Sequence, residues 1–510
     1  MRLAPSVVAA LLLGVATVLG FAPFGFSELT VLTLAALFLF WRQAQSARAA
    51  AWIGYAFGAG LFGAGASWVY IALALFGGME GVLAGLATLA FCAYLALLPA
   101  LAGLATARLV PQPSNFRFIA AASCWTLAEW LRSWLFSGFP WLSVGYAHVQ
   151  TPLGGYAPLG GVFLTSLAVA TSGALVAYGA VCLRSGISRR AVFAAVALLA
   201  LWLAGLGLRA IPWSDPVGAP VTVSLVQGNI PEEIKFDAAY RDQTLATYAE
   251  LVAQAKGRLI VLPESALPMF ADEVPADYVA KLRNAALERQ GDLLLGLFFF
   301  EPRQAGEDED HYFNSVVSLG TATTQRYRKH HLVPFGETIP LKSLFGWFIR
   351  GVLHIPLADQ TPGAANQAPM QVAGQRVAVN ICYEDAFGGE LLHALPEATL
   401  LVNVTNDAWY GRSLAAEQHE QIAAMRALET ARPMLRATNT GITSIIDHHG
   451  AEIGRLPWFM RGILESAIAG RRGTTPYVRF GDFPAIAFAF LLGVGAALAW
   501  RKWRGAPLIQ

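Results

Sequence analysis

Cys382 is the residue of this sequence best suited to covalent chemistry. It is the one cysteine in the polar stretch 216–479, whereas the other three lie in apolar runs, where a small apolar residue is the ordinary explanation. The β-branched segment 377–381 before it predicts a strand, and Y-E-D follows where a helix could begin. A helix N-terminus favours a thiolate and offers backbone N–H groups to an oxyanion, so the context indicates a nucleophile.

Glu264 and Lys329 could complete a mechanism with that thiol. Glu264 stands at the end of a predicted strand in L-P-E-S, where a carboxylate can act as a general base. Lys329 lies in Y-R-K-H-H-L-V-P-F-G-E, and an ammonium near a thiol lowers the thiol pKa and can stabilise a tetrahedral oxyanion. Taken singly, a surface carboxylate and a solvated loop cation would be the more frequent explanations.

Other catalytic chemistries lack their motifs. The sequence has no G-x-S-x-G, no H-E-x-x-H and no glycine-rich phosphate loop ending in Lys-Ser/Thr. The histidine pairs 330–331 and 448–449 are adjacent in sequence, so they do not share a helix face as zinc ligands would. We therefore expect no metal and no cofactor. A net charge of +2 without a basic run argues against a nucleic-acid partner.

Short strands alternating with helices predict the layers that position these residues. Strands are expected at 221–226, 258–262, 292–300, 313–319, 376–381, 399–404 and 441–446, and helices at 238–256, 278–289 and 417–430. This alternation favours an α/β layer architecture. The apolar, aromatic segment 341–355 fits either a core helix or a lid that dips into the bilayer interface. The lid is slightly favoured because the domain is tethered to the membrane at both ends.

Long uncharged runs indicate a membrane-embedded chain. Only 14% of the residues are charged and 55% are hydrophobic, whereas a globular domain carries about a quarter charged residues. Eight spans are predicted, at about 5–23, 26–41, 52–76, 82–107, 117–136, 158–182, 191–208 and 483–500. The second is the weakest because it is short and carries Glu28. Arg2 before an apolar run could suggest a signal peptide, but further uncharged runs follow, so we expect a retained first helix.

Positive charge fixes the expected orientation, because cytoplasmic loops collect Arg and Lys. Every second loop is basic. The residues concerned are Arg2, Arg42, Arg48, Arg108, Arg117, Arg184, Arg189, Arg190, Arg501, Lys502 and Arg504. Both termini are then cytoplasmic, and the large polar segment lies on the opposite side. The expected domains are a seven-span bundle at 1–210, an extracytoplasmic domain at 218–475 and an eighth span at 483–500.

One pair of charges lies inside a predicted span. Glu129 and Arg132 are spaced i,i+3, so they could pair on one face of a helix. Charges within the membrane often mark functional sites, and structural pairing within the bundle is an equally good explanation here.

The order of Glu264, Lys329 and Cys382, each beside a strand end, resembles the nitrilase superfamily. The strings L-P-E-S, Y-x-K-x-H-L-V-P-F-G-E and N-I-C-Y-E-D carry this resemblance together, although L-P-E alone would be weak. Joined to an eight-span bundle, they look like the apolipoprotein N-acyltransferase family. Further matching strings are E-W-L-R, G-F-P-W, V-Q-G-N-I-P and V-T-N-D-A-W, so the resemblance covers essentially the whole chain. It implies an αββα sandwich on a membrane bundle.

The resemblance implies a catalytic triad of Glu264, Lys329 and Cys382 and a ping-pong reaction. Cys382 would take the sn-1 acyl group of a phospholipid, expected to be phosphatidylethanolamine, as a thioester. The amine of a diacylglyceryl-cysteine at an apolipoprotein N-terminus would then accept it. We expect a monomer in the bacterial inner membrane with a periplasmic catalytic domain. The alternatives are a membrane-anchored amidase that hydrolyses C–N bonds with the same triad, and a scaffold with a degenerate nitrilase domain.

Four further residues have supporting roles by the same resemblance. Glu337 would hold the site open or orient Lys329, and Glu384 would sit behind the nucleophile, next to Tyr383. Phe236 stands where the family often has Trp. Both are large aromatic residues that could contact an acyl chain, so little loss of function is expected from this departure.

Overall fold

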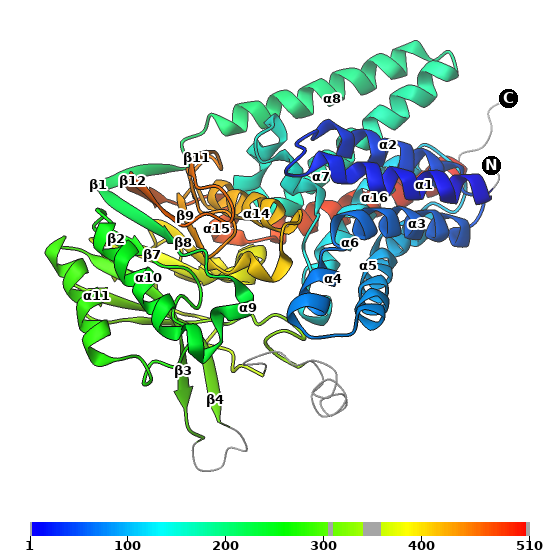
Figure 1. Cartoon of the computed structure of the whole chain (residues 1–510). Helices are drawn as coiled ribbons and strands as arrows, with labels where there is room; N and C mark the ends of the chain where they lie inside the picture. Colours follow the sequence, from blue (N-terminus) through cyan, green and yellow to red (C-terminus); the bar gives the residue numbers. More distant parts are fainter. Residues whose placement is uncertain (1–2, 304–309, 340–358, 506–510) are drawn as a thin grey trace. The chain divides into compact units, whose positions relative to one another are not determined.

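The computed structural model describes residues 3–303, 310–339 and 359–505 (Figure 1). The chain divides into two compact units. The helical unit takes in residues 1–68, 85–211 and 479–510, and the sheet unit takes in 69–84 and 212–478. The segment 69–84 therefore groups with the sheet unit, although most of it falls within the predicted spans 52–76 and 82–107.

Long apolar helices make up the helical unit. Its helices are α1 (Leu3–Thr17), α2 (Glu28–Gln43), α3 (Ala47–Gly65), most of α5 (Gly81–Leu109), α6 (Phe116–Arg132), α7 (Ala157–Arg184), α8 (Ser188–Arg209) and α16 (Phe483–Gly505). Among the described residues, five helices are long and apolar enough to cross a membrane, or six if Ala47–Gly65 and Val69–Phe76 form one broken span. The number of eight spans stays a prediction.

The predicted span at 52–76 is wrong as a single helix. Helix α3 ends at Gly65, and α4 (Val69–Ile71) and the π-helical turn η2 (Ala72–Phe76) follow only after a break. Three glycines, at 60, 63 and 65, precede that break. Because glycine is a poor helix former, a glycine-rich stretch is where a long apolar helix ends most easily.

The buried charges Glu129 and Arg132 hold the loop that follows α6. The Glu129 Oε1 atom accepts hydrogen bonds from the backbone N–H of Val144 at 2.9 Å and from Trp125 Nε1 at 2.9 Å. Arg132 Nη1 donates to the carbonyl of Phe139 at 2.6 Å. Backbone groups of one loop thus contact both charged side chains, which favours the structural explanation of this pair, although Glu129 Oε2 has no hydrogen-bond partner within the described residues.

Two six-stranded sheets form the sheet unit. The first has the order β12 (Gly462–Gly473), β1 (Ser214–Gln227), β2 (Leu259–Val261), β3 (Asp292–Glu301), β4 (His311–Gly320), β5 (Arg326–Arg328). The second has the order β11 (Glu452–Arg455), β10 (Ser444–Ile446), β9 (Met434–Thr438), β8 (Leu400–Thr405), β7 (Gln375–Ile381), β6 (Met370–Val372). In each sheet the central three strands, β1–β2–β3 and β7–β8–β9, are parallel. Functional residues of such sheets lie at the carboxyl ends of the strands.

The expected strands and helices of this unit are confirmed, with small shifts at their ends. The helices are α10 (Arg241–Gln254), α11 (Ala276–Glu288) and α14 (Ala415–Thr430). Five strands were not expected: β5, β6, β9, β11 and β12. In β9 all five residues are buried, among them a charged one, Arg436, so the strand has neither an apolar run nor an alternating pattern.

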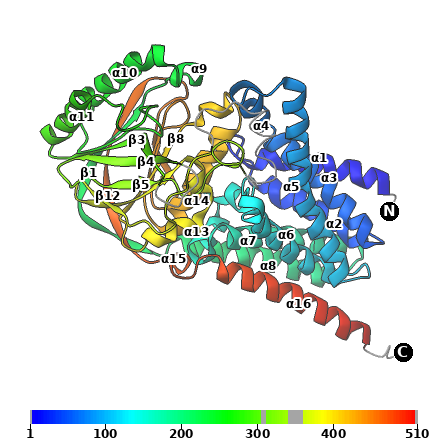
Figure 2. The same cartoon turned by 90° about the horizontal axis from the view of Figure 1, so that it is seen from below.

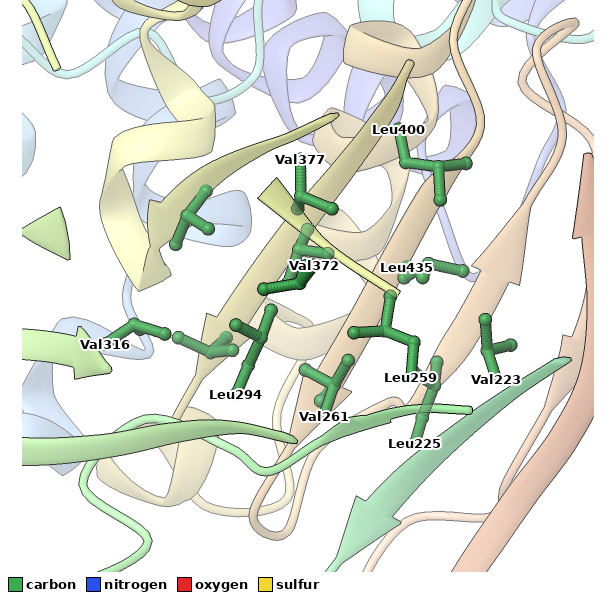
Figure 3. Packing of buried hydrophobic residues seen from close by; sticks show 14 of the residues in the cluster. Val223, Leu225, Leu259, Val261, Leu294, Val316, Val372, Val377, Leu400 and Leu435 are labelled. Atoms are coloured by element: carbon green, nitrogen blue, oxygen red, sulfur yellow. The ribbon is translucent and has the colours of Figure 1, made fainter. Parts of the chain in front are cut away.

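Aliphatic side chains fill the space between the two sheets (Figure 3). Labelled members from the first sheet are Val223, Leu225, Leu259, Val261 and Leu294, and those from the second are Val377, Leu400 and Leu435. A second cluster joins the other face of the first sheet to α10 and α11, which lie side by side in Figures 1 and 2. Helix α14 packs against β9 and β10 of the second sheet. The expected αββα sandwich is confirmed.

Candidate active site

The three residues predicted for the triad all lie at strand ends and are buried. Glu264 comes shortly after β2, Lys329 directly follows β5, and Cys382 directly follows β7. Their exposed fractions are 6%, 1% and 7%. Lys329 Nζ lies 3.2 Å from Glu264 Oε1, and the charges of both act on the Cys382 thiol. The fold therefore brings a carboxylate, an ammonium and a thiol from three separate strands into one site.

Three donors surround the Glu264 carboxylate. Its Oε1 atom accepts hydrogen bonds from Asn314 Nδ2 at 2.8 Å and from Lys329 Nζ at 3.2 Å, and Oε2 accepts one from the backbone N–H of Asn406 at 3.0 Å. All three donors favour an acceptor group, and an ionised carboxylate has about four acceptor positions. Glu264 therefore retains the capacity to accept a proton from the thiol.

Lys329 is a permanent cation in this site. Its Nζ atom donates to Glu264 and, at 2.7 Å, to Glu337 Oε1, while Glu337 Oε2 accepts from the backbone N–H of Val333. Burial lowers the pKa of Lys329, but the carboxylates of Glu264 and Glu337 outweigh burial and raise this pKa well above its ordinary value. Glu337 thus lies where it can orient the ammonium.

The surroundings of the Cys382 thiol do not favour a thiolate in the way that the helix N-terminus expected from the sequence would. Burial, and next the charge of Glu264, raise the pKa of Cys382 well above its ordinary value, and Lys329 only partly opposes them. The expected helix is also short, because η7 (Cys382–Ala386) is a five-residue 3-10 helix. A thiol whose pKa is raised reacts more readily with the help of a general base, and Glu264 is the carboxylate whose charge acts on it most strongly.

The backbone of Cys382 has a left-handed conformation, with φ +53°. A non-glycine residue rarely adopts this region, and such strain is common at functional sites. The Cys382 carbonyl accepts hydrogen bonds from Asn403 Nδ2 and His419 Nε2, both at 3.2 Å. These contacts hold the turn that presents the thiol.

Comparison with known proteins agrees with both units. The family model described as "Apolipoprotein N-acyltransferase N-terminal domain" matches residues 13–175, and the one described as "Carbon-nitrogen hydrolase" matches residues 222–477. A curated relative from Nitrosomonas europaea, "Apolipoprotein N-acyltransferase", is 49% identical over 97% of this chain and 98% of its own length. The chain belongs to the apolipoprotein N-acyltransferase family.

Other members of the family are also similar over nearly their full length. The relative from Ralstonia nicotianae is 42% identical, with 98% of this chain and 94% of the relative covered. The one from Chromobacterium violaceum is 40% identical, with 98% and 95% covered. The nitrilase-like fold predicted for the sheet unit is confirmed by the carbon-nitrogen hydrolase match, which spans β1 to β12.

In this family member, Glu384 hydrogen-bonds both to the end of β7, before Cys382, and to the loop that contains Lys329. Its carboxylate accepts hydrogen bonds from the backbone N–H groups of Ile381 and His330, both at 2.6 Å, and from the Tyr327 hydroxyl at 3.1 Å. Burial raises the pKa of Glu384 to about 7, against the pull of these backbone donors. Glu384 thus hydrogen-bonds to the backbone directly before Cys382 and directly after Lys329.

Tyr383 and Phe236, the two aromatic residues predicted to support the site, each contact a phenylalanine ring. The Tyr383 ring packs edge-on to Phe387, with the ring centroids 5.0 Å apart. Phe236 is half-buried, and its ring centroid is 6.4 Å from that of Phe298. The predicted lid at 341–355 lies outside the described residues.

Lys235 is a buried cation that sequence reasoning missed. It ends the short helix α9 (Glu232–Lys235), is 2% exposed, and donates from Nζ to the carbonyl of Glu264 at 3.4 Å. Burial lowers the pKa of Lys235, and the carboxylates of Glu232 and Glu264 oppose this shift. The signal was available, because Lys235 directly precedes Phe236 in the loop that the family resemblance singled out.

A buried cluster of four charges lies under the nucleophile turn, and sequence reasoning missed it too. His419, from α14, contacts Asp385 through Nε2 at 2.8 Å and Asp407 through Nδ1 at 2.9 Å. Arg436, from β9, contacts Asp385 Oδ2 at 3.1 Å and Asp407 Oδ2 at 2.9 Å. Burial and Arg436 lower the pKa of His419, but the two aspartates outweigh them and raise it to about 9.

This cluster predicts that the protein loses stability in mild alkali. Because the pKa of His419 rises from 6.5 to about 9 on folding, the imidazolium stabilises the fold fully below about pH 6.5. The stabilisation is lost as the pH rises through about 9. Thermal unfolding of the intact chain in detergent should show a melting temperature that falls between pH 7 and pH 9.5. His419→Gln should flatten this dependence, while the same change at exposed His393 should not.

Proposed function

We propose that this chain transfers a fatty acyl group from a phospholipid to the N-terminal amine of diacylglyceryl-cysteine in apolipoproteins, by way of a thioester at Cys382. The name shared by its relatives supports this acyl transfer. The observation that carries the covalent route is the buried group of Glu264, Lys329 and Cys382. The described helices that are apolar enough to span a membrane suit two lipid-anchored substrates.

In the first half-reaction, Glu264 accepts the thiol proton while Sγ of Cys382 attacks the sn-1 ester carbonyl of the phospholipid. A C–S bond forms, and the carbonyl oxygen becomes an oxyanion. Lys329 uses two of its three N–H donors on Glu264 and Glu337, so the third can stabilise this oxyanion. The ester C–O bond then breaks, and Glu264 gives its proton to the leaving oxygen. Lysophospholipid departs, and the acyl group stays on Cys382.

In the second half-reaction, the unprotonated α-amine of the acceptor attacks the thioester carbonyl. A C–N bond forms, the C–S bond breaks, and Glu264 moves the amine proton to the departing sulfur. The products are an amide on the apolipoprotein and the resting thiol. Since no water takes part, the site must exclude it while the thioester exists.

The donor that we propose is phosphatidylethanolamine, and the place of reaction is the periplasmic face of the inner membrane. Arg and Lys in alternate loops support this orientation, with both termini in the cytoplasm. A chemical reason for the arrangement is that the acyl chains can stay in hydrocarbon while the carbonyl carbon reaches Cys382.

The proposal predicts that phospholipid alone acylates the enzyme. The purified chain in detergent is incubated with phosphatidylethanolamine radiolabelled in its sn-1 acyl chain, without any acceptor. Label should become attached to the protein, resist denaturation, and be released by neutral hydroxylamine, which cleaves thioesters. Cys382→Ala should abolish the label, whereas the matched control Cys182→Ala, which alters a buried cysteine of α7, should keep it.

The competing amidase reading predicts a different result. The carbon-nitrogen hydrolase domain would release ammonia from small amides and take no label from the phospholipid. Such a pair of results contradicts the acyltransferase. A scaffold with a degenerate domain would do neither, and Cys382→Ala would leave its cellular function intact.

A further inference from the structure

Thr405 is a buried hydroxyl residue at the end of β8. Its exposed fraction is 0%, and within the part of the chain that the structure describes its Oγ1 atom has no hydrogen-bond partner. An unsatisfied buried hydroxyl costs folding free energy. A threonine at this position therefore calls for an explanation that the resting structure does not contain.

The strand register places Thr405 between the nucleophile and the base. In the parallel pair β7–β8, Ile381 is the partner of Val404, so Thr405, the last residue of β8, lies next to the turn at Cys382 that directly follows β7. The residue after Thr405 is Asn406, whose backbone N–H donates to Glu264 Oε2 at 3.0 Å. The orphan hydroxyl thus belongs to the short stretch that links the thiol to its general base.

The hydroxyl gains a partner only when the sulfur is charged. A neutral thiol is a weak hydrogen-bond acceptor. A thiolate is a charged acceptor, and hydrogen bonds to charged groups are stronger. Consistent with this, a hydrogen bond from the Thr405 hydroxyl to a charged Cys382 sulfur would lower the pKa of the thiol, against burial and Glu264. An interaction that exists only in the reacting state lowers the barrier instead of stabilising the ground state.

The ammonium of Lys329 has other hydrogen-bond acceptors, so we do not assign to it the hydrogen bond to the sulfur. Lys329 Nζ donates to Glu264 and Glu337, which leaves one N–H for the substrate oxyanion. The sulfur carries negative charge at two moments, when Cys382 loses its proton and when the thioester C–S bond breaks. Both moments need a donor near Sγ.

We propose that Thr405 is a further catalytic residue, whose hydroxyl donates a hydrogen bond to the Cys382 sulfur as it becomes negative. The hydroxyl keeps its own proton throughout, since Glu264 carries the proton that leaves the thiol. The inference rests on the proposed role of Cys382 as the nucleophile, but its test does not need an acyl donor.

The test compares Thr405→Val, which replaces the hydroxyl by a methyl group of similar size, with Thr405→Ser, which keeps the hydroxyl. The rate of Cys382 alkylation by iodoacetamide is followed between pH 7 and pH 10 by mass spectrometry of the Cys382 peptide, because the other cysteines are also free. Loss of one hydrogen bond to a charged group should slow alkylation by Thr405→Val about tenfold to a hundredfold at a given pH, which displaces the profile to higher pH. Thr405→Ser should restore it.

Stability should change in the opposite sense to reactivity. Because the Thr405 hydroxyl has no hydrogen-bond partner among the described residues, Thr405→Val should melt at the same temperature as the wild type or higher. Thr438 is the matched control, since it is the register partner of Thr405 and is equally buried. Its hydroxyl, however, is hydrogen-bonded to the Thr443 hydroxyl, with the two Oγ1 atoms 3.0 Å apart. Thr438→Val should lower the melting temperature and leave the alkylation profile unmoved.

Two results would overturn the inference: a wild-type alkylation profile in Thr405→Val, or an equal displacement in Thr438→Val. Failure of the proposed function is recognised separately. In that case phospholipid leaves no hydroxylamine-sensitive label on the wild type, although the alkylation profiles can still differ as described.

Discussion

Glu264→Gln is expected to slow acylation of Cys382 by about a hundredfold to ten-thousandfold, the usual contribution of a general base. The variant keeps the shape of the side chain but loses the proton acceptor. Its amide also presents donors to a pocket that already contains Asn314 Nδ2, Lys329 Nζ and the Asn406 N–H. The measurement is the initial rate at which labelled phosphatidylethanolamine acylates the enzyme, without acceptor.

The pH profile distinguishes a base from a mere counter-charge. Burial alone raises the pKa of Cys382, and the Glu264→Gln variant has no base beside the thiol, so solvent must remove the thiol proton. The acylation rate should then rise about tenfold per pH unit across neutral pH. Glu337→Gln removes the other carboxylate on Lys329 Nζ, yet its profile should keep the wild-type shape. A steep profile in both variants, or in neither, contradicts the assignment of Glu264 as the base.

Arg436→Met is expected to destabilise the protein by about 3–5 kcal/mol, because it leaves two buried aspartates without their cation. Arg436 is 0% exposed and joins Asp385 to Asp407 beneath the nucleophile turn. His419 alone would then have to balance both carboxylates. The measurement is denaturant unfolding of the intact chain in detergent, followed by a spectroscopic signal that reports on the sheet unit.

An exposed ion pair serves as the control for that variant. Arg376 and Glu397 are 2.9 Å apart, with side chains 44% and 65% exposed, so Arg376→Met should cost only about 0–1 kcal/mol. Arg436→Lys keeps the charge but cannot reach both aspartates with a planar fork, and it should fall between the two. If Arg436→Met unfolds no more easily than Arg376→Met, the cluster does not stabilise the turn.

The sequence by itself determined the features that depend on local pattern. Strand–helix alternation placed Glu264 and Cys382 beside strand ends, and β7 and β8 appear within one residue of their predicted positions. The strand before Lys329, β5, was not expected from the pattern. The uncharged runs indicated a membrane protein, because a helix of about 20 apolar residues has the length that crosses a bilayer. Family strings such as V-T-N-D-A-W also pointed to the segment that contains Thr405, although they said nothing of its role.

Only the tertiary structure decided which groups surround the Cys382 thiol and in which direction they shift its pKa. Burial and Glu264 raise the pKa of Cys382 and Lys329 lowers it, and burial depends on how two sheets pack. Thr405 and Arg436 meet Cys382 and Asp385 through the pairing of β7, β8 and β9. The sequence pattern marks where strands end, but which strands lie side by side is a property of long-range pairing. The reactivity of Cys382, the nucleophile expected from the sequence, therefore depends on side chains that the fold brings from other strands.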